Sequence, residues 1–179
     1  MRPAPRRRAS GVAPLRPGVA PGTGRSAERR AHIASSRRVD PAVLQIPNDR
    51  PIIVFDGHCV LCSGWVRFIL ARDRRALYRL LPAQSAAGHA LYVHCGLDPA
   101  NYETYMLIEN GTVYFKSEAA IRMAQGLGLP WSAAGAFRIL PARLRDRIYD
   151  WVARNRFRGF GRRDACYRPE APYAGRFLA

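Results

Sequence analysis

Short apolar runs separated by turn signals open the ordered part of the chain. Residues 51–55, Pro-Ile-Ile-Val-Phe, form a continuous apolar and β-branched run, which is typical of a strand buried on both faces of a sheet. The run ends at Asp56-Gly57, a turn signal. From Val60 onward, apolar residues recur at spacings of three and four with arginines between them, which predicts an amphipathic helix. The order is therefore strand, tight turn, helix.

A second strand and a second helix follow. Residues 77–81 alternate in polarity enough to predict a strand that Pro82 closes, and residues 85–93 predict a short helix that ends near Gly96. Together with the first strand and helix they form a β-α-β unit. The two strands of such a unit run parallel and are joined by a right-handed connection.

A hairpin and a third helix complete the pattern of the domain. Residues 105–108 and 112–115 are apolar runs on either side of Asn110-Gly111, the strongest short-range signal for a β-hairpin. Ser117 is predicted to cap the helix that follows, because an early acid and good helix formers come after its hydroxyl. The expected order is β-α-β-α-β-β-α, which is an α/β domain.

Two more helices are expected at the C-terminal end. Residues 133–140 and 144–154 have helical patterns and are separated by Pro141. The second of them has four apolar residues on one face: Leu144, Ile148, Trp151 and Val152. Residues from about 131 to 179 therefore form a C-terminal helical segment, rich in arginine and aromatic residues, that we expect to pack on the domain.

The first quarter of the chain has a different composition. Residues 1–48 are rich in Pro, Gly, Ala, Ser and Arg, and they contain no aromatic residue and no apolar periodicity. Such a segment buries too little apolar surface to fold, so we expect a disordered tail. The folded domain, residues 49–179, is expected to begin near Asp49 and to be the only one.

The chain is strongly basic, with a formal net charge of +16 that comes almost entirely from arginine. Half of the excess lies in residues 1–48, where a solvated tail is a commoner explanation than a nucleic-acid arm, so we do not expect a nucleic-acid partner. No apolar run reaches the ~18 residues of a membrane span. We therefore expect a soluble protein of the cytoplasm, or of an organelle if residues 1–48 are a transit peptide.

The chemistry of the chain is concentrated in Cys59-Val60-Leu61-Cys62, at the start of the first predicted helix. The unpaired N–H groups and the positive end of the helix dipole favour a thiolate at Cys59, whose pKa should fall below the usual ~8.5. Cys59 is therefore the predicted nucleophile, and Cys62 is the thiol that resolves the mixed disulfide. The expected partners are a disulfide-containing protein or small molecule and an electron donor, and we expect no cofactor.

Two side chains beside these cysteines have candidate roles. Asp56 lies three residues before Cys59, at the carboxyl end of the buried strand, where ligands meet such sheets. Its carboxylate either shuttles a proton for Cys62 or caps the turn by accepting the backbone N–H of Gly57 or His58. His58 is either a cation that lowers the pKa of Cys59 or a solvated loop residue.

A metal-binding module is the alternative to redox chemistry. One CxxC is half of a structural zinc site, and further ligands would have to come from His94 or Cys166. Both lie far from Cys59 and Cys62 along the chain, so redox chemistry without a bound metal is preferred. Cys166 is a candidate third redox thiol, whereas Cys95 is more typical of a core residue. A further possibility is an interaction protein that binds acidic partners through its basic surface.

The chain resembles the DCC family of thiol-disulfide oxidoreductases, named for an Asp-Cys-Cys pattern. The signature is residues 53–62, Ile-Val-Phe-Asp-Gly-His-Cys-Val-Leu-Cys. The resemblance runs from about residue 51 to the end through later segments: 72–73, 84–85, 110–120, 147–151, 154–157, 160–166 and 176–178. It implies a thioredoxin-like fold and disulfide exchange through Cys59 and Cys62, with Asp56 as the third signature residue.

One departure from thioredoxins concerns the residue that faces the CxxC. Thioredoxins place a cis-proline just before the hairpin strand, where it holds substrate backbone and keeps metal out. In this chain Thr104 precedes Tyr105, and the nearest preceding proline is Pro99. Thr104 is therefore the candidate for substrate contact, and the missing proline leaves metal binding open.

Overall fold

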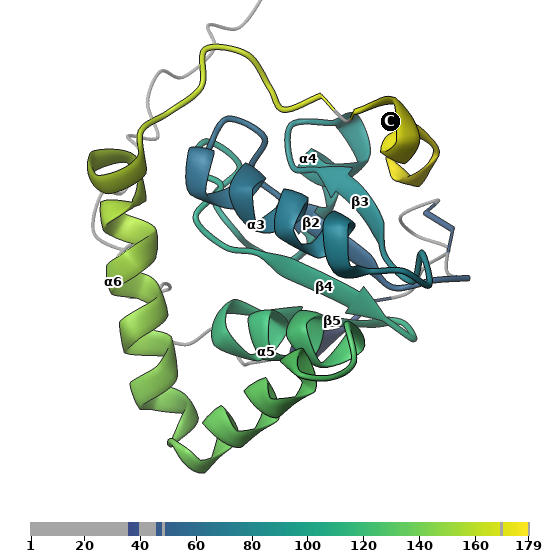
Figure 1. Ribbon diagram of the computed structural model, residues 1–179. Helices are drawn as coiled ribbons and strands as arrows, with labels where there is room; N and C mark the ends of the chain where they lie inside the picture. Colours follow the sequence, from purple (N-terminus) through teal and green to yellow (C-terminus); the bar gives the residue numbers. More distant parts are fainter. Residues whose placement is uncertain (1–35, 40–45, 48, 169, 179) are drawn as a thin grey trace, which may run out of the picture. The chain divides into compact units, whose positions relative to one another are not determined.

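A computed structural model describes residues 36–39, 46–47, 49–168 and 170–178 (Figure 1). Within them, five strands form one mixed sheet in the order β1-β5-β4-β2-β3. The strands are β1 (Ser36–Arg38), β2 (Ile52–Phe55), β3 (Arg79–Pro82), β4 (Met106–Glu109) and β5 (Thr112–Phe115). The helices are α3 (Val60–Arg72), α4 (Ala86–His94), α5 (Lys116–Gly126) and α6 (Ala142–Phe160), with 3₁₀ helices η2 (Trp131–Ile139) and η3 (Ala171–Arg176). After β1 the order is the expected β-α-β-α-β-β-α, so the predicted α/β class is confirmed, and it is compatible with a thioredoxin-like fold plus a C-terminal helix.

Strand β2 lies inside the sheet, between β4 and β3, and all four of its residues are apolar and buried. It pairs in parallel with β3 and antiparallel with β4. Side chains alternate between the two faces of a strand, so Ile52 and Val54 pack in the core with α4, whereas Ile53 and Phe55 pack with α3 and α5. Figure 1 shows α3 crossing in front of the sheet. The end of β2 therefore delivers Asp56 to the edge of the sheet where α3 begins.

The hairpin and the second helix form as the sequence predicts. Strands β4 and β5 pair antiparallel, and Asn110 and Gly111 have positive φ values of 49° and 70°, as a two-residue hairpin turn of the primed type requires. Ser85 caps α4, since its hydroxyl accepts the backbone N–H of Gly88 at 3.1 Å. Local chemistry was sufficient to predict both features.

Two local predictions are wrong. Ser117 does not cap α5, because the helix begins at Lys116 without a side-chain cap and the Ser117 hydroxyl donates to the carboxylate of Asp146 in α6. Strand β3 begins two residues later than expected, at Arg79, and includes Pro82. The proline is tolerated because β3 lies at the edge of the sheet, where an N–H is not needed on the outer side.

The domain also begins earlier than the predicted boundary at residue 49. Strand β1 pairs antiparallel with β5 at the other edge of the sheet, Val39 is buried in the core, and Ile46 packs against that core. All three residues of β1 are polar and exposed. The sequence therefore shows no apolar alternation there that would predict a strand. The disordered tail expected for the rest of residues 1–48 lies outside the described residues.

The C-terminal helices differ from expectation in length and orientation. The 3₁₀ helix η2 (Trp131–Ile139) takes the place of the α-helix expected at residues 133–140, and α6 is longer than residues 144–154. Three residues of the expected apolar face are exposed: Leu144 (45%), Ile148 (54%) and Trp151 (64%). The face of α6 that carries Arg156 packs inward instead, and Arg156 is buried. No helix in the described part of the chain is long and apolar enough to span a membrane.

The last residues of the chain return to the end of α3. Asp73, which follows α3, accepts the backbone N–H groups of Leu77 and Tyr78, each at 3.0 Å. Its carboxylate also pairs with Arg176, which donates to the Tyr78 carbonyl at 3.0 Å. Asp73 therefore ties the turn between α3 and β3 to the C-terminal residues.

Asp73→Ala should lower the free energy of unfolding by about 2–4 kcal/mol, because it leaves buried N–H groups and the Arg176 guanidinium without their acceptor. Asp49→Ala is the matched control, since the half-exposed Asp49 pairs with Arg79 at 2.8 Å and an exposed ion pair contributes only about 0–1 kcal/mol. Urea denaturation of both variants measures the difference. Equal losses would contradict the role given to Asp73.

Candidate functional site

Both cysteines of the CxxC lie at the start of α3, directly after the turn that ends β2. Cys59 occupies the N-cap position, and its Sγ accepts a hydrogen bond from the backbone N–H of Cys62 at 3.2 Å. The N–H of Cys59 donates to the Asp56 carbonyl at 3.3 Å. Both cysteines are buried free thiols. The structure therefore brings the predicted pair together within one turn of helix.

The surroundings shift the pKa values of the two thiols in opposite directions. Hydrogen bonding from Cys62 lowers the pKa of Cys59 from 9.0 to about 7, although burial opposes the shift. The hydrogen bond with Cys59 and burial raise the pKa of Cys62 well above its ordinary value. The positive charge of Arg156 lowers the pKa of both thiols. Cys59 is therefore the thiol that ionises near neutral pH, which supports the predicted division of roles.

Asp56 is held on three sides. One carboxylate oxygen accepts the backbone N–H of His58 at 3.0 Å and the side-chain amide of Gln84 at 2.6 Å. The other oxygen pairs with Arg156 at 3.3 Å, and the exposed fractions of these two side chains are only 5% and 3%. The bond to His58 is one that a turn cap makes. The proton-shuttle role stays a prediction.

Arg156 is the main part of this site that sequence reasoning missed. It comes from α6, 100 positions after Asp56, and its guanidinium also donates to the carbonyls of Tyr102 at 3.1 Å and Ala153 at 3.0 Å. The chain has 29 Lys and Arg residues, so neither composition nor spacing distinguishes this one. The single available signal was its place in one of the segments shared with the DCC family.

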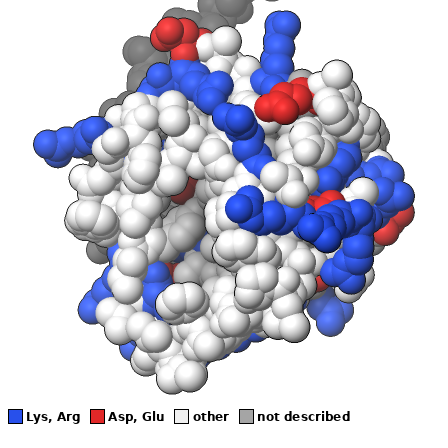
Figure 2. Space-filling model, viewed as in Figure 1, with Lys and Arg blue, Asp and Glu red and all other residues white. Residues whose placement is uncertain are grey.

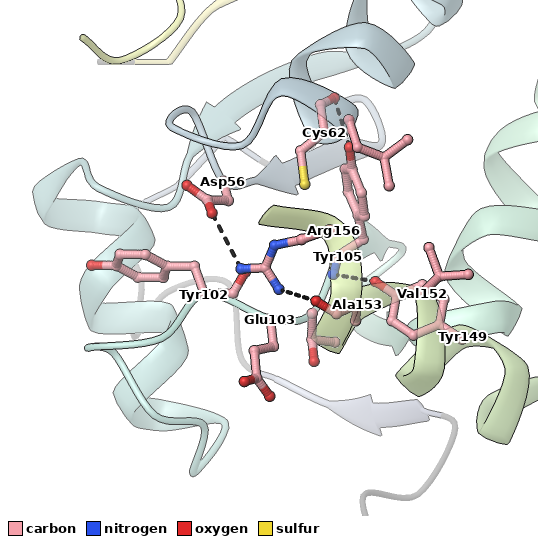
Figure 3. A pocket seen from close by; sticks show the side chains of 11 residues that line it. Asp56, Cys62, Tyr102, Glu103, Tyr105, Tyr149, Val152, Ala153 and Arg156 are labelled. Atoms are coloured by element: carbon pink, nitrogen blue, oxygen red, sulfur yellow. Dashed lines mark hydrogen bonds and ion pairs between the residues drawn. The ribbon is translucent and has the colours of Figure 1, made fainter. Parts of the chain in front are cut away.

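A cavity of about 50 Å³ opens between α3, α6 and the loop before β4 (Figure 3). Asp56, Cys62 and Arg156 line it, together with apolar side chains such as Leu61 and Val152. In Figure 3 the Cys62 sulfur points toward Arg156, whose guanidinium reaches Asp56 and the Ala153 carbonyl. Figure 2 shows a hollow beside α6 with mostly uncharged walls. A cavity of this volume holds a few water molecules or one small chemical group.

Thr104 lies in the loop before β4 and lines this cavity. It is buried, and its carbonyl accepts the hydroxyl of Tyr92. The next residue, Tyr105, donates its N–H to the Tyr149 hydroxyl at 2.9 Å and its own hydroxyl to the Cys62 carbonyl at 2.6 Å. Two backbone groups of the loop are therefore already bonded to tyrosines of α4 and α6. Contact between Thr104 and substrate stays a prediction.

A segment near the C-terminus, residues 162–167, lies over the CxxC loop and is called the covering segment below. Arg162 forms an antiparallel bridge with Cys59, and the N–H of Arg163 donates to the His58 carbonyl at 2.7 Å. The Nδ1 atom of His58 is 3.2 Å from the Arg163 carbonyl, so the imidazole faces this segment. Cys59 is 0% exposed. Cys59 is therefore closed to a substrate disulfide in this arrangement.

Cys166 belongs to the covering segment and lies beside Gly57. A Cβ atom added to Gly57 would be 2.2 Å from the Cys166 Sγ, and the same sulfur is 3.9 Å from Oε1 of Gln84. The next residue, Tyr167, donates its N–H to the Gly57 carbonyl at 2.9 Å. Burial raises the pKa of Cys166. Cys166 therefore lies at the edge of the site, and its role as a third redox thiol stays a prediction.

His94 and Cys95 lie at the end of α4, on the opposite face of the sheet from α3. Cys95 is a buried core residue, and burial raises its pKa to about 11. His94 is exposed. In the described part of the chain, no three His, Cys, Asp or Glu side chains are placed to hold a metal ion together. The geometry therefore adds no further ligand to the metal-binding alternative.

Gly57→Ala should expose Cys59 by pushing the covering segment away. The added Cβ would meet the Cys166 Sγ, and overpacking of this kind costs about 1–3 kcal/mol, so iodoacetamide should label Cys59 several-fold faster. Gly64→Ala in α3 is the matched control, because its Cβ would meet nothing within 4 Å. Adding Cys166→Ala to Gly57→Ala should restore slow labelling. Peptide mass spectrometry measures the labelling of Cys59. Equal labelling rates in all variants would refute the covering role.

Comparison with known proteins gives one family match and two relatives. The chain matches the family described as DCC1-like thiol-disulfide oxidoreductase over residues 53–162. It is 38% identical over 134 residues to the uncharacterized protein YuxK of Bacillus subtilis, covering 75% of this chain and 96% of YuxK. It is 39% identical over 118 residues to a chloroplastic DCC family protein of Arabidopsis thaliana, covering 65% of this chain and 69% of the relative. No solved structure matches the chain.

Proposed function

The chain belongs to the DCC1-like thiol-disulfide oxidoreductase family, and from its site we propose that it exchanges disulfides with Cys59 as nucleophile and Cys62 as resolving thiol. Family membership makes it an oxidoreductase. The observation that carries the assignment of roles is the pair of opposite pKa shifts at two cysteines one helical turn apart. Only a thiolate attacks a disulfide efficiently, and Cys59 is the thiol that ionises near neutral pH.

The proposed reaction has two displacement steps. The Cys59 thiolate attacks one sulfur of the substrate disulfide, and the other substrate sulfur leaves with the electron pair and takes a proton from solvent. Cys62 then loses its proton and attacks the Cys59 sulfur, which releases the second substrate thiol. The substrate disulfide is reduced to two thiols, and the enzyme is left with a Cys59–Cys62 disulfide. A dithiol electron donor reduces this disulfide to complete the cycle.

Asp56 is the proposed proton acceptor in the second step. Its carboxylate lines the same cavity as Cys62, and a carboxylate near a thiol can accept its proton during attack. His58 and Gln84 hold the oxygen that does not face Arg156. This arrangement fixes the carboxylate at the end of β2.

The proposed substrates are disulfide-containing proteins or small molecules. The relative in Arabidopsis thaliana carries the word chloroplastic in its name, which supports an organellar compartment as the alternative to the cytoplasm. The covering segment limits access to Cys59, so a substrate must displace residues 162–167 before the first attack. No part of this proposal requires a cofactor.

The rate of attack by Cys59 should follow its ionisation. With a pKa of about 7, labelling by iodoacetamide should be half-maximal near pH 7 and level off about one pH unit higher, whereas an ordinary thiol reaches half of its maximum near pH ~8.5. The sign follows from the lowered pKa, because more thiolate is present at neutral pH. Labelling of Cys59 between pH 5 and 10 gives the profile. A midpoint above pH ~8 would contradict the assignment of Cys59 as the ionised thiol.

Reduction of insulin with dithiothreitol as electron donor tests the function directly. The wild-type protein should accelerate the reaction, and Cys59→Ser should not. Elemental analysis of the same preparation tests the alternative, in which Cys59 and Cys62 bind a metal together with Cys166 or His94. Stoichiometric metal without acceleration of insulin reduction would replace the redox function with metal binding.

A further inference from the structure

Arg156 has an unusual position for an arginine near the end of an amphipathic helix. It is 3% exposed, and it lines the same cavity as Cys62 and Asp56. Two of its nitrogens have partners: Nη1 donates to the Ala153 carbonyl, and Nη2 donates to the Tyr102 carbonyl and to Asp56. The guanidinium is therefore fixed in one orientation by the backbone and by a buried carboxylate.

The third nitrogen of this guanidinium has no acceptor. Among the described residues, Arg156 Nε and Arg145 Nη1 are the buried side-chain nitrogen and oxygen atoms without a hydrogen-bond partner. Arg145 Nη1 forms an ion pair with Glu118 at 3.5 Å, whereas nothing in the described chain is bonded to Arg156 Nε. Buried donors without acceptors are rare in native proteins and are often found at functional sites. The Nε–H group is therefore a free donor, and a group that becomes negative during the reaction can act as its acceptor.

Cys62 is the group near Arg156 that becomes an acceptor during the reaction. Its thiol is 5% exposed, and burial opposes its ionisation. Resolution nevertheless requires a thiolate at this sulfur. The charge of Arg156 favours ionisation of both Cys62 and Cys59, and Figure 3 shows the Cys62 sulfur pointing toward Arg156. The cation and the unpaired donor therefore border the same cavity as the sulfur on which negative charge develops.

We propose that Arg156 is a catalytic residue of resolution, in which its Nε–H donates a hydrogen bond to the Cys62 thiolate; this inference rests on the proposed function. In that step the Cys62 thiol gives its proton to Asp56, and its electron pair forms the bond to the Cys59 sulfur. The bond between Cys59 and the substrate sulfur breaks, and that sulfur leaves with the electron pair and is protonated. The Cys62 sulfur is oxidised, the substrate sulfur is reduced, the Cys59 sulfur stays at the disulfide level, and Arg156 keeps its proton throughout.

Single-turnover reduction of dithiodipyridine separates the two displacement steps. The probe is neutral, so Arg156 does not attract it by charge, and each step releases one equivalent of coloured thiopyridone. The first release reports attack by Cys59, and the second reports resolution by Cys62. At pH 9 Cys59 is ionised with or without Arg156, so only the second release should depend on Arg156.

Arg156→Gln should slow the second release about tenfold or more at pH 9, which corresponds to a rise of about one unit in the pKa of Cys62. Arg156→Lys keeps the charge without the directed Nε–H and should fall between Arg156→Gln and the wild type. Arg154→Gln, an exposed position of the same helix, is the matched control and should leave both releases unchanged. The ratio of the two rate constants is the readout, because a general loss of folding would change both releases.

A second test avoids the unpaired Asp56 carboxylate that Arg156→Gln leaves behind. It compares the double variant Asp56→Asn/Arg156→Gln, which has neither charge, with Asp56→Asn alone. If Arg156→Gln alone fails to fold, this pair decides the matter, and the double variant should again be slower in the second release alone. Equal second releases, or an equal slowing of both releases, would overturn the role of Arg156. A different result would contradict the proposed function itself. The wild type would then show no second release, or Cys62→Ser would show the same second release as the wild type.

Discussion

Cys59→Ser is expected to reduce disulfide exchange to the background rate, whereas Cys62→Ser is expected to complete the first step and stop. The reason is the difference between the two thiols in the folded protein. Cys59 lies at the N-cap of α3 with its pKa lowered to about 7, and the pKa of Cys62 is raised. A serine hydroxyl does not ionise at neutral pH, so Cys59→Ser removes the attacking group itself. Cys62→Ser removes only the group that releases the mixed disulfide.

Intact-mass measurement after incubation with oxidised glutathione distinguishes the two variants. Cys62→Ser should accumulate a single glutathione adduct, which peptide mapping should place on Cys59, and Cys59→Ser should accumulate none. Cys95→Ser is the control, because Cys95 is a core residue on the other face of the sheet and should behave as the wild type. Equal activity of Cys59→Ser and Cys62→Ser would show that the roles are wrongly assigned. An adduct on Cys166 would indicate that this third thiol takes part.

The sequence predicted the parts of the site that depend on neighbours along the chain. The apolar run of residues 52–55, the turn after it and the helix that begins at Val60 place Cys59 and Cys62 together, and this needs only local periodicity and capping rules. The hairpin follows in the same way from Asn110-Gly111. Each of these features repeats a pattern with a fixed short spacing.

The missed features depend on contacts between distant segments. Arg156 reaches Asp56 across 100 positions, and the covering segment reaches the CxxC loop through Arg163 and His58, 105 positions apart. Strand β1 is three exposed polar residues that are recognisable only by their pairing with β5. Periodicity contains no information on such contacts. The prediction that the apolar face of α6 packs on the domain was wrong for the same reason. The helix packs through the face that carries Arg156, which the helical pattern alone does not reveal.

Asp56→Asn is expected to destabilise the fold as well as slow the reaction, because Asp56 is half of a buried ion pair. Removing one partner of such a pair leaves a buried charge uncompensated, which typically costs about 3–5 kcal/mol. Arg156 keeps two carbonyl acceptors, so we expect a loss near the lower end, about 3 kcal/mol in urea denaturation. Asp56→Asn/Arg156→Gln should recover most of this loss, since it replaces the ion pair with two neutral amides.

The rate of resolution distinguishes a proton shuttle from a structural partner of Arg156. If Asp56 accepts the proton of Cys62, Asp56→Asn should slow the second release of thiopyridone about 10²-fold near neutral pH, and the deficit should shrink as pH rises because solvent hydroxide then removes the proton. The first release should change little at pH 9, where Cys59 is ionised. Asp49→Asn, at an exposed position, is the control. If the double variant regained the rate together with the stability, or if Asp56→Asn slowed neither release, Asp56 would act only by capping the turn and pairing with Arg156.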